Sequence, residues 1–139
     1  MKQSAQPYLH FEGLCRQAMV FYQELFGGDL EIMIISESPV KDQFPAELQD
    51  QVLHASLTNE AFRLRAADMC GAGELIQGNS FEILLDCTSE DELRMVYNKL
   101  SIGGTISLEP GHQFWGSLFG MVIDKFGVRW MLSYEEKNQ

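Results

Sequence analysis

Alternating apolar and polar residues near the C-terminal end of the chain predict a β-hairpin. It spans Gln113 to Tyr134, with a turn at Asp124 to Gly127, because Gly127 can adopt the positive φ that such turns require. Successive side chains of a strand point to opposite faces. The second arm therefore has a packing face and a mixed face, which carry Val128, Trp130 and Leu132 on one side and Arg129 and Met131 on the other. We expect the mixed face to contribute to a site.

The first half of the chain predicts one helix and four strands. Apolar residues recur at three- and four-residue spacing from Leu14 to Leu25, and the helix ends at Gly27-Gly28. Ser36 to Asp50 is predicted to be a surface loop with a short helical turn at Ala46 to Gln49. The predicted strands are Pro7–Glu12, Leu30–Ile35, Gln51–Thr58 and Ala61–Asp68, of which the last two form a hairpin.

The second half repeats this order of elements. A strand from Ser80 to Asp86 leads into Thr88–Glu92, whose residues are typical of a helix N-terminus. The next strand begins at Thr105. Met95-Val96-Tyr97 precedes Gly103-Gly104 at the same spacing at which Met19-Val20-Phe21 precedes Gly27-Gly28. We therefore expect an α+β fold in a single domain, residues 1–139, with a repeated βαβββ module over about 6–68 and 79–134.

Composition limits the possible partners and the compartment. The chain has 139 residues, 45% of them hydrophobic, which is enough for a core. A formal net charge of −10 disfavours nucleic acid and anionic membranes as partners, since both are polyanions. Three cysteines without a CxxC pair disfavour a disulfide framework or zinc knuckle. With no apolar run long enough to span a bilayer, we expect a cytoplasmic protein.

Several segments resemble one protein family over nearly the whole chain, from Pro7 to Leu132. They read PYLHFEG, AMVFYQELFGG and VLHASL in the first half, and QFWGSLFG and DKFGVRWML in the second. They are similar to the PhnB-like branch of the glyoxalase/bleomycin-resistance/dioxygenase group, the vicinal oxygen chelate superfamily. The resemblance implies paired βαβββ modules, a curved and mostly antiparallel sheet around a cavity, and a homodimer.

Members of this branch often carry the description of a ubiquinone-pathway methyltransferase, and the sequence argues against that activity. A methyltransferase that uses S-adenosylmethionine normally needs a glycine-rich loop after a parallel strand and an acid on the next strand. This chain has no GxGxxG, and 139 residues of mainly antiparallel pattern leave no room for such a domain.

Metal enzymes of the superfamily use His and Glu ligands, one from each of four strands, and the resemblance implies where those positions fall in this chain. The positions are Gln6 or Pro7, Arg65 or Ala66, a residue between Ser80 and Glu82, and Met131. Only Glu82 is a strong ligand for a divalent ion, and Gln6 is a weak one. We therefore expect no cofactor, with a divalent metal as the alternative.

The three histidines are candidate acid–base or ligand residues. His54 lies in the middle of a strand and is either a core histidine or an acid–base group of the cavity. His10 lies between apolar strand residues, which favours a structural role. His112 follows Pro110-Gly111 in an expected solvated loop.

Aromatic residues gather near the start of the predicted hairpin. Gly116 and Gly120 interrupt its first arm, where a glycine marks a bulge or the close approach of a ligand or another backbone. The side chains of Phe114, Trp115 and Phe119 form either an aromatic wall for a ligand or part of the core or a dimer interface.

Two classes of function remain open at this point. One is an enzyme acting on a small oxygenated metabolite, and the other is a protein that binds a small aromatic or apolar ligand. We favour binding, because three of the four metal positions lack a strong ligand. Arg129 would bind a carboxylate or phosphate, and His54 would be the catalytic group that transfers a proton. The predicted ligand-binding residues are Arg129, Met131, Trp115, Phe114, His10 and Glu82.

Overall fold

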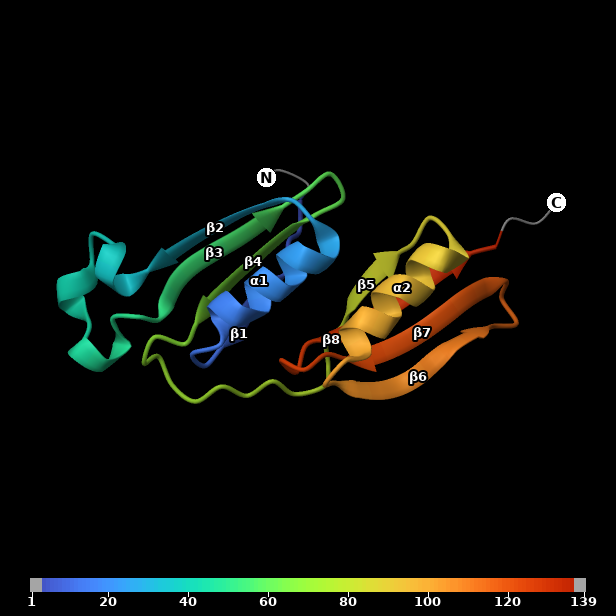
Figure 1. Cartoon of the computed structure of the whole chain (residues 1–139). Coiled ribbons are helices and arrows are strands. Elements are labelled where there is room, and N and C mark those ends of the chain that lie inside the picture. The colour runs from blue at the N-terminus through green and yellow to red at the C-terminus, as the bar shows by residue number, and fades with distance from the viewer. Residues whose placement is uncertain (1–3, 137–139) are drawn as a thin grey trace. The chain divides into compact units, whose positions relative to one another are not determined.

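The computed structural model describes residues 4–136 and consists of two compact units that divide after Ile76. Each unit has its own helix and its own four-stranded sheet (Figure 1). No helix within residues 4–136 is both long enough and apolar enough to cross a membrane.

The first unit is a mixed sheet with one helix. Its elements are β1 (Tyr8–Phe11), α1 (Cys15–Phe26), β2 (Asp29–Ile34), β3 (Val52–Thr58) and β4 (Arg63–Asp68). The strand order is β1-β4-β3-β2, in which only β1 and β4 are parallel. Three short 3₁₀ helices lie between β2 and β3, at Ile35–Glu37, Lys41–Gln43 and Ala46–Leu48, and the third confirms the expected helical turn.

The second unit has the same topology. Its elements are β5 (Ile83–Asp86), α2 (Glu90–Ser101), β6 (Thr105–His112), β7 (Ser117–Ile123) and β8 (Arg129–Glu135). The strand order is β5-β8-β7-β6, and again only the first pair, β5 and β8, is parallel. The two units confirm the predicted α+β fold of paired βαβββ modules.

Each helix covers one face of its own sheet (Figure 1). Tyr22 and Leu57 are buried in the core under α1, and Tyr97 and Trp130 are buried in the core of the second unit. Burial of such large apolar side chains is the main stabilising contribution, at about 25 cal/mol per Å² of apolar surface. We call the opposite face of each sheet, away from the helix, its open face.

A buried aspartate ties the elements of the first unit together. Asp68 Oδ1 accepts hydrogen bonds from the backbone N–H groups of Gly13 at 2.8 Å and Cys15 at 3.0 Å. Its Oδ2 accepts a third from the backbone N–H of Val52 at 2.8 Å. One carboxylate at the end of β4 therefore holds both the start of α1 and the start of β3.

The predicted C-terminal hairpin is confirmed, and Asp124 fixes its turn as expected. Its Oδ1 accepts from the backbone N–H groups of Phe126 at 2.8 Å and Val128 at 3.1 Å. Its Oδ2 accepts from Trp130 Nε1 at 2.9 Å. Gly127 completes the turn with a φ of +87°.

Three strand boundaries differ from the prediction by three or more residues, and the others differ by at most two. β5 begins at Ile83, because its pairing with β8 starts at Trp130 and leaves the segment before Ile83 without a partner strand. β6 extends to His112, which therefore ends a strand and does not lie in a loop. β7 begins only at Ser117, after a turn in which Gly116 has a φ of +94°.

Each unit has one glycine that allows a close backbone contact, and the two glycines occupy equivalent positions. A Cβ on Gly28 would lie 2.5 Å from the carbonyl oxygen of Thr58, and one on Gly104 would lie 2.2 Å from that of Ile123. Gly120 meets a side chain instead, since its Cβ would lie 3.1 Å from the ring of Tyr97. The close neighbour at Gly120 is therefore a side chain and not the ligand or backbone that the sequence led us to expect.

When α1 is aligned with α2 in the structure, the residue pairs are shifted by one position from the pairs that the sequence motifs suggested. α1 and α2 are both 12 residues long, and alignment of their first residues pairs Tyr22 with Tyr97, which are both buried. Met19 is buried, whereas Met95, which the sequence match paired with it, is 45% exposed. The glycine pairs keep the sequence spacing, so the second unit gains one residue between its helix and Gly103.

Candidate functional site

The open face of the first sheet is polar. Side chains there alternate with those under α1, such as Ala55, Leu57, Leu64 and Ala66, which are buried. One row crosses the four strands through Tyr8, Arg65, Ser56 and Glu31. In the adjacent row, His10 pairs with Ala67 and His54 pairs with Met33. Short-range sequence patterns cannot predict these rows, because each combines strands from distant parts of the chain.

Arg65 is held in place on this face. Its Nε donates a hydrogen bond to Gln6 Oε1 at 2.8 Å. Its neighbour on the same strand and face, Arg63, donates to Thr58 Oγ1 at 3.3 Å. The segment before β1 thus brings an amide oxygen beside a guanidinium. Gln6 is one of the two residues, with Pro7, that the resemblance implies for the first metal-ligand position, and Arg65 is one of the two, with Ala66, for the second.

A tyrosine and two histidines lie on the same open face. The Tyr8 hydroxyl lies 3.4 Å from His54 Nδ1, and the rings of Tyr8 and His10 are 5.3 Å apart. Ala67 is the small residue between the two histidines, so the tyrosine ring can extend over β4. Burial raises the pKa of the Tyr8 phenol, which keeps it protonated at neutral pH.

Two of the three histidines lie on the open face of the first sheet. His10 is exposed on the open face, whereas the side chains of Leu9 and Phe11, the apolar neighbours that favoured a structural role, point to the other side of the strand. His54 is half-buried and lies on the open face, not in the core under α1.

The open face of the second sheet is mainly apolar. Leu84, Met131, Met121 and Leu108 form one row across its four strands. Arg129 lies two residues before Met131 on the same face, beside Ile123. Trp130 and Leu132 are buried on the helix side, which confirms the predicted alternation of β8. The Nε atom of Arg129 is buried and has no hydrogen-bond partner.

The aromatic residues near β7 form a cluster at the surface of the second unit. Phe114 is 96% exposed and Trp115 is 53% exposed, because both lie in the turn between β6 and β7. Their rings are 5.0 Å apart, and Trp115 lies 5.9 Å from Phe119. A core role is therefore excluded for Phe114 and Trp115, whereas a ligand wall and an interface both remain open.

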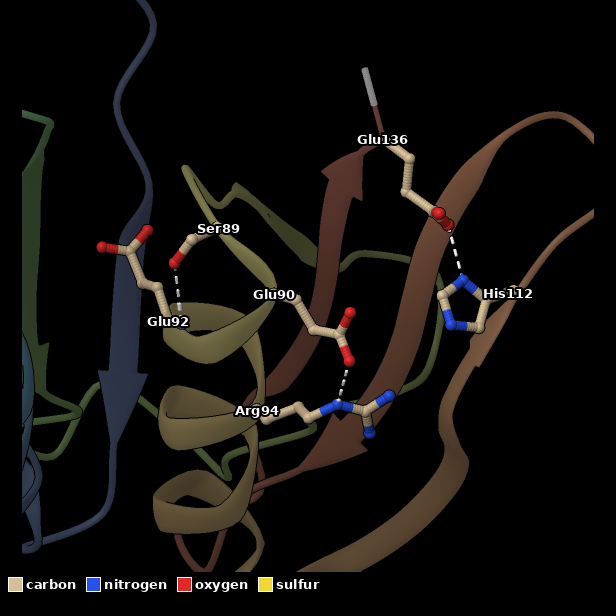
Figure 2. A network of polar contacts seen from close by, with 6 residues as sticks. All are labelled: Ser89, Glu90, Glu92, Arg94, His112 and Glu136. Atoms are coloured by element: carbon tan, nitrogen blue, oxygen red, sulfur yellow. Dashed lines mark hydrogen bonds and ion pairs between the residues drawn. The ribbon is translucent and has the colours of Figure 1, made fainter. Parts of the chain in front are cut away.

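Figure 2 shows the polar contacts of α2 and the β6 end in the second unit. Ser89 Oγ accepts from the backbone N–H of Glu92, which confirms the predicted N-cap cluster. Glu90 and Arg94 form an ion pair one helical turn apart. His112 Nδ1 contacts Glu136 Oε1 at 2.5 Å, with both side chains exposed. Such exposed pairs contribute little free energy and do not form a site.

The remaining metal positions lie in the second unit. Glu82 is exposed and directly precedes β5, whose first residue, Ile83, pairs with Trp130. Met131 presents a thioether on the open face. Within residues 4–136, no three His, Cys, Asp or Glu side chains lie close enough together to hold a metal ion.

Burial raises the pKa of all three cysteine thiols. Burial, with Asp68 nearby, raises the pKa of the Cys15 thiol to about 12, and burial, with Glu92 nearby, raises that of Cys87 to about 11. Burial also raises the pKa of Cys70. All three thiols are therefore protonated at neutral pH.

Residues 3–133 match the model of a protein family described as 3-demethylubiquinone-9 3-methyltransferase. The chain belongs to this family. It is 30% identical over 135 residues to Protein YjdN of Escherichia coli (strain K12), which covers 91% of this chain and 92% of that protein.

Two solved structures are similar over nearly their whole length. Protein PA1353 from Pseudomonas aeruginosa is 35% identical with a TM-score of 0.87, over 98% of this chain and 100% of that chain. A putative 3-demethylubiquinone-9 3-methyltransferase, PhnB protein, from Bacillus cereus is 28% identical with a TM-score of 0.76, over 95% and 99% of the two chains.

A structure with much lower sequence identity shares the fold. A glyoxalase/bleomycin resistance protein/dioxygenase family enzyme from Burkholderia phytofirmans PsJN is 11% identical with a TM-score of 0.62, over 94% of this chain and 97% of that one. These comparisons confirm the PhnB-like branch and the glyoxalase-like fold that the sequence motifs indicated.

Proposed function

We propose that this PhnB-like protein binds a small molecule on the open faces of its sheets, without the metal ion that enzymes of the superfamily use. The observation that carries the proposal is the hydrogen bond from Arg65 to Gln6. A guanidinium has five donors, no lone pair and a permanent positive charge, so it cannot ligate a cation and repels one. The Gln6 oxygen already accepts a hydrogen bond from it.

The residues at the third and fourth metal-ligand positions do not replace the ligands that are missing at the first two. Met131 offers a soft thioether, which suits Cu(I) better than the hard divalent ions that chelate substrate oxygens. Glu82 remains as one strong ligand, and a single carboxylate does not make a site. The ligand set therefore does not fit a divalent metal.

The proposal gives the guanidinium the role that a metal would have, as the fixed positive charge for oxygen atoms of the ligand. Arginine binds carboxylates and phosphates through charge-assisted hydrogen bonds. Tyr8, His10 and His54 would add neutral hydrogen-bonding groups on the first sheet. In the second unit, the residues proposed to contact ligand are Arg129, Met131, Phe114, Trp115 and Glu82.

Methyl transfer is not part of this proposal, although the family description names it. Neither unit offers the glycine-rich loop that a bound S-adenosylmethionine normally requires, since the chain has no GxGxxG. We further propose that the protein is a cytoplasmic homodimer.

A second candidate function is acid–base catalysis, and the contact between Tyr8 and His54 favours it. His54 would accept a proton from a bound metabolite, while the phenol would donate a hydrogen bond to the developing negative charge. Turnover that is lost in His54→Gln while ligand affinity is retained would distinguish this enzyme from a binding protein.

A thermal-shift screen of short, polar carboxylate and phosphate metabolites, which lack an apolar body, tests the proposed function at Arg65. We expect at least one compound to raise the melting temperature equally with and without EDTA. Arg65→Gln should remove that shift, whereas the matched control Arg63→Gln, on the same strand and face, should retain it. A shift that needs added divalent metal, or that survives Arg65→Gln, would contradict the proposal.

A further inference from the structure

Arg129 has a polar atom that the protein leaves unpaired. Its Nε is buried without a hydrogen-bond partner, and no carboxylate within residues 4–136 forms an ion pair with this guanidinium. A buried unpaired donor costs about 1 to 3 kcal/mol, and more when the group is charged. A ligand that accepts a hydrogen bond at this atom would remove that cost.

The surroundings of Arg129 indicate what the rest of that ligand is. Next to it, Leu84, Met131, Met121 and Leu108 cross the sheet as an apolar row, whose end residues Leu84 and Leu108 are 53% and 41% exposed. Four strands at about 4.8 Å spacing make the row about 14 Å long. Thioether side chains adapt to ligands of different shape.

Arg129 lies close enough to the apolar row for one small molecule to contact both. Arg129 and Met131 are two residues apart on β8, which is about 7 Å along a strand. The chain carries twenty acidic and ten basic side chains, so a positive charge on an apolar face is a local exception to its overall field. Its complement is an anionic head joined to an apolar body.

We propose that the open face of the second sheet binds a small amphipathic monocarboxylate. Its carboxylate accepts a hydrogen bond from Arg129 Nε, and its apolar part lies along the row from Leu84 to Leu108. This inference deepens the proposed function and rests on it only in that both invoke small-molecule binding. Arg65, in the first unit, has no part in it.

Calorimetric titration with octanoate, 1-octanol and acetate tests the inference on the full chain. Octanoate should bind more tightly than either of the others, because only it has both the charge and the apolar body. Arg129→Met should weaken octanoate binding about tenfold or more, the worth of a hydrogen bond to a charged group, and leave 1-octanol unchanged. Arg94→Met, which removes an exposed arginine from α2, is the matched control and should bind octanoate normally.

Arg129→Lys is a second variant that tests the inference even if Arg129→Met does not fold. Lysine keeps a positive charge without the Nε donor, so octanoate should bind more weakly than to the wild type but still better than 1-octanol. Equal binding of octanoate and 1-octanol by the wild type, or unchanged octanoate affinity in either Arg129 variant, would overturn the inference. Either result leaves the EDTA and Arg65→Gln results of the metabolite screen unaffected, so the two failures can be told apart.

Discussion

Arg65 Nε and Gln6 Oε1 are joined by a 2.8 Å hydrogen bond across 59 residues of sequence. The bond puts a permanent cation on the open face of the first sheet, next to Tyr8 and within the same polar surface as His54. In a protein with this fold, the charge that meets the ligand's oxygens would then come from a side chain.

Gly104 provides a direct test of how the second unit packs. Gly104→Ala should destabilise the protein by about 2 kcal/mol, because its Cβ would lie 2.2 Å from the backbone oxygen of Ile123. Gly111→Ala, also on β6, is the control, since its Cβ meets nothing closer than 3.8 Å. Urea unfolding measures both, and equal stabilities of the two variants would refute the close contact.

Asp124 should be the most sensitive residue of the hairpin turn. Asp124→Ala leaves the N–H groups of Phe126, Val128 and the Trp130 indole without this acceptor, and we expect a loss of about 3 kcal/mol or more. Asp50→Ala, at an exposed loop position, should change the unfolding free energy by less than about 0.5 kcal/mol. A loss no greater than that of the control would show that the turn does not depend on this carboxylate.

Alkaline pH should weaken the fold through its buried thiols. The folded-state pKa of Cys15, about 12, lies above its ordinary value of 9.0, so the folded chain keeps a proton that the unfolded chain releases. The stabilisation is therefore complete below pH 9 and is lost as the pH rises towards 12, by up to about 1.4 kcal/mol per pH unit. Cys15→Ala should have a flatter pH dependence of unfolding between pH 8 and 10.5, and an unchanged slope would contradict this assignment.

The predicted homodimer rests on the resemblance to the superfamily and on exposed apolar residues. The cluster of Phe114, Trp115 and Phe119 is one surface that a second copy could cover. Light scattering at micromolar concentration should give twice the chain mass of 15.8 kDa. A mass of one chain would exclude the dimer under those conditions.

Local patterns predicted the elements well, because each depends on neighbours in the sequence. Alternation in β8 identified Trp130 as a packing residue and Arg129 as an open-face residue, and the glycine pairs marked the ends of both helices. The boundary of β5 was missed, since it depends on where the distant strand β8 begins.

The candidate site was harder to predict for the same physical reason. Tyr8 was overlooked, although its alternation with His10 in PYLHF put both side chains on one face of a strand. Its contact with His54 depends on the small Ala67 between them, on a strand more than fifty residues away from Tyr8. The bond between Gln6 and Arg65 likewise needs the parallel pairing of β1 with β4, which no short-range pattern reveals.

Elemental analysis of protein purified without chelator tests the central claim most directly. The ligand set around Arg65 and Gln6 predicts far less than one equivalent of any divalent transition metal per chain, and no saturable binding when Mn²⁺ or Zn²⁺ is added by titration. One equivalent of tightly bound metal, removed by chelator together with ligand binding, would contradict the account.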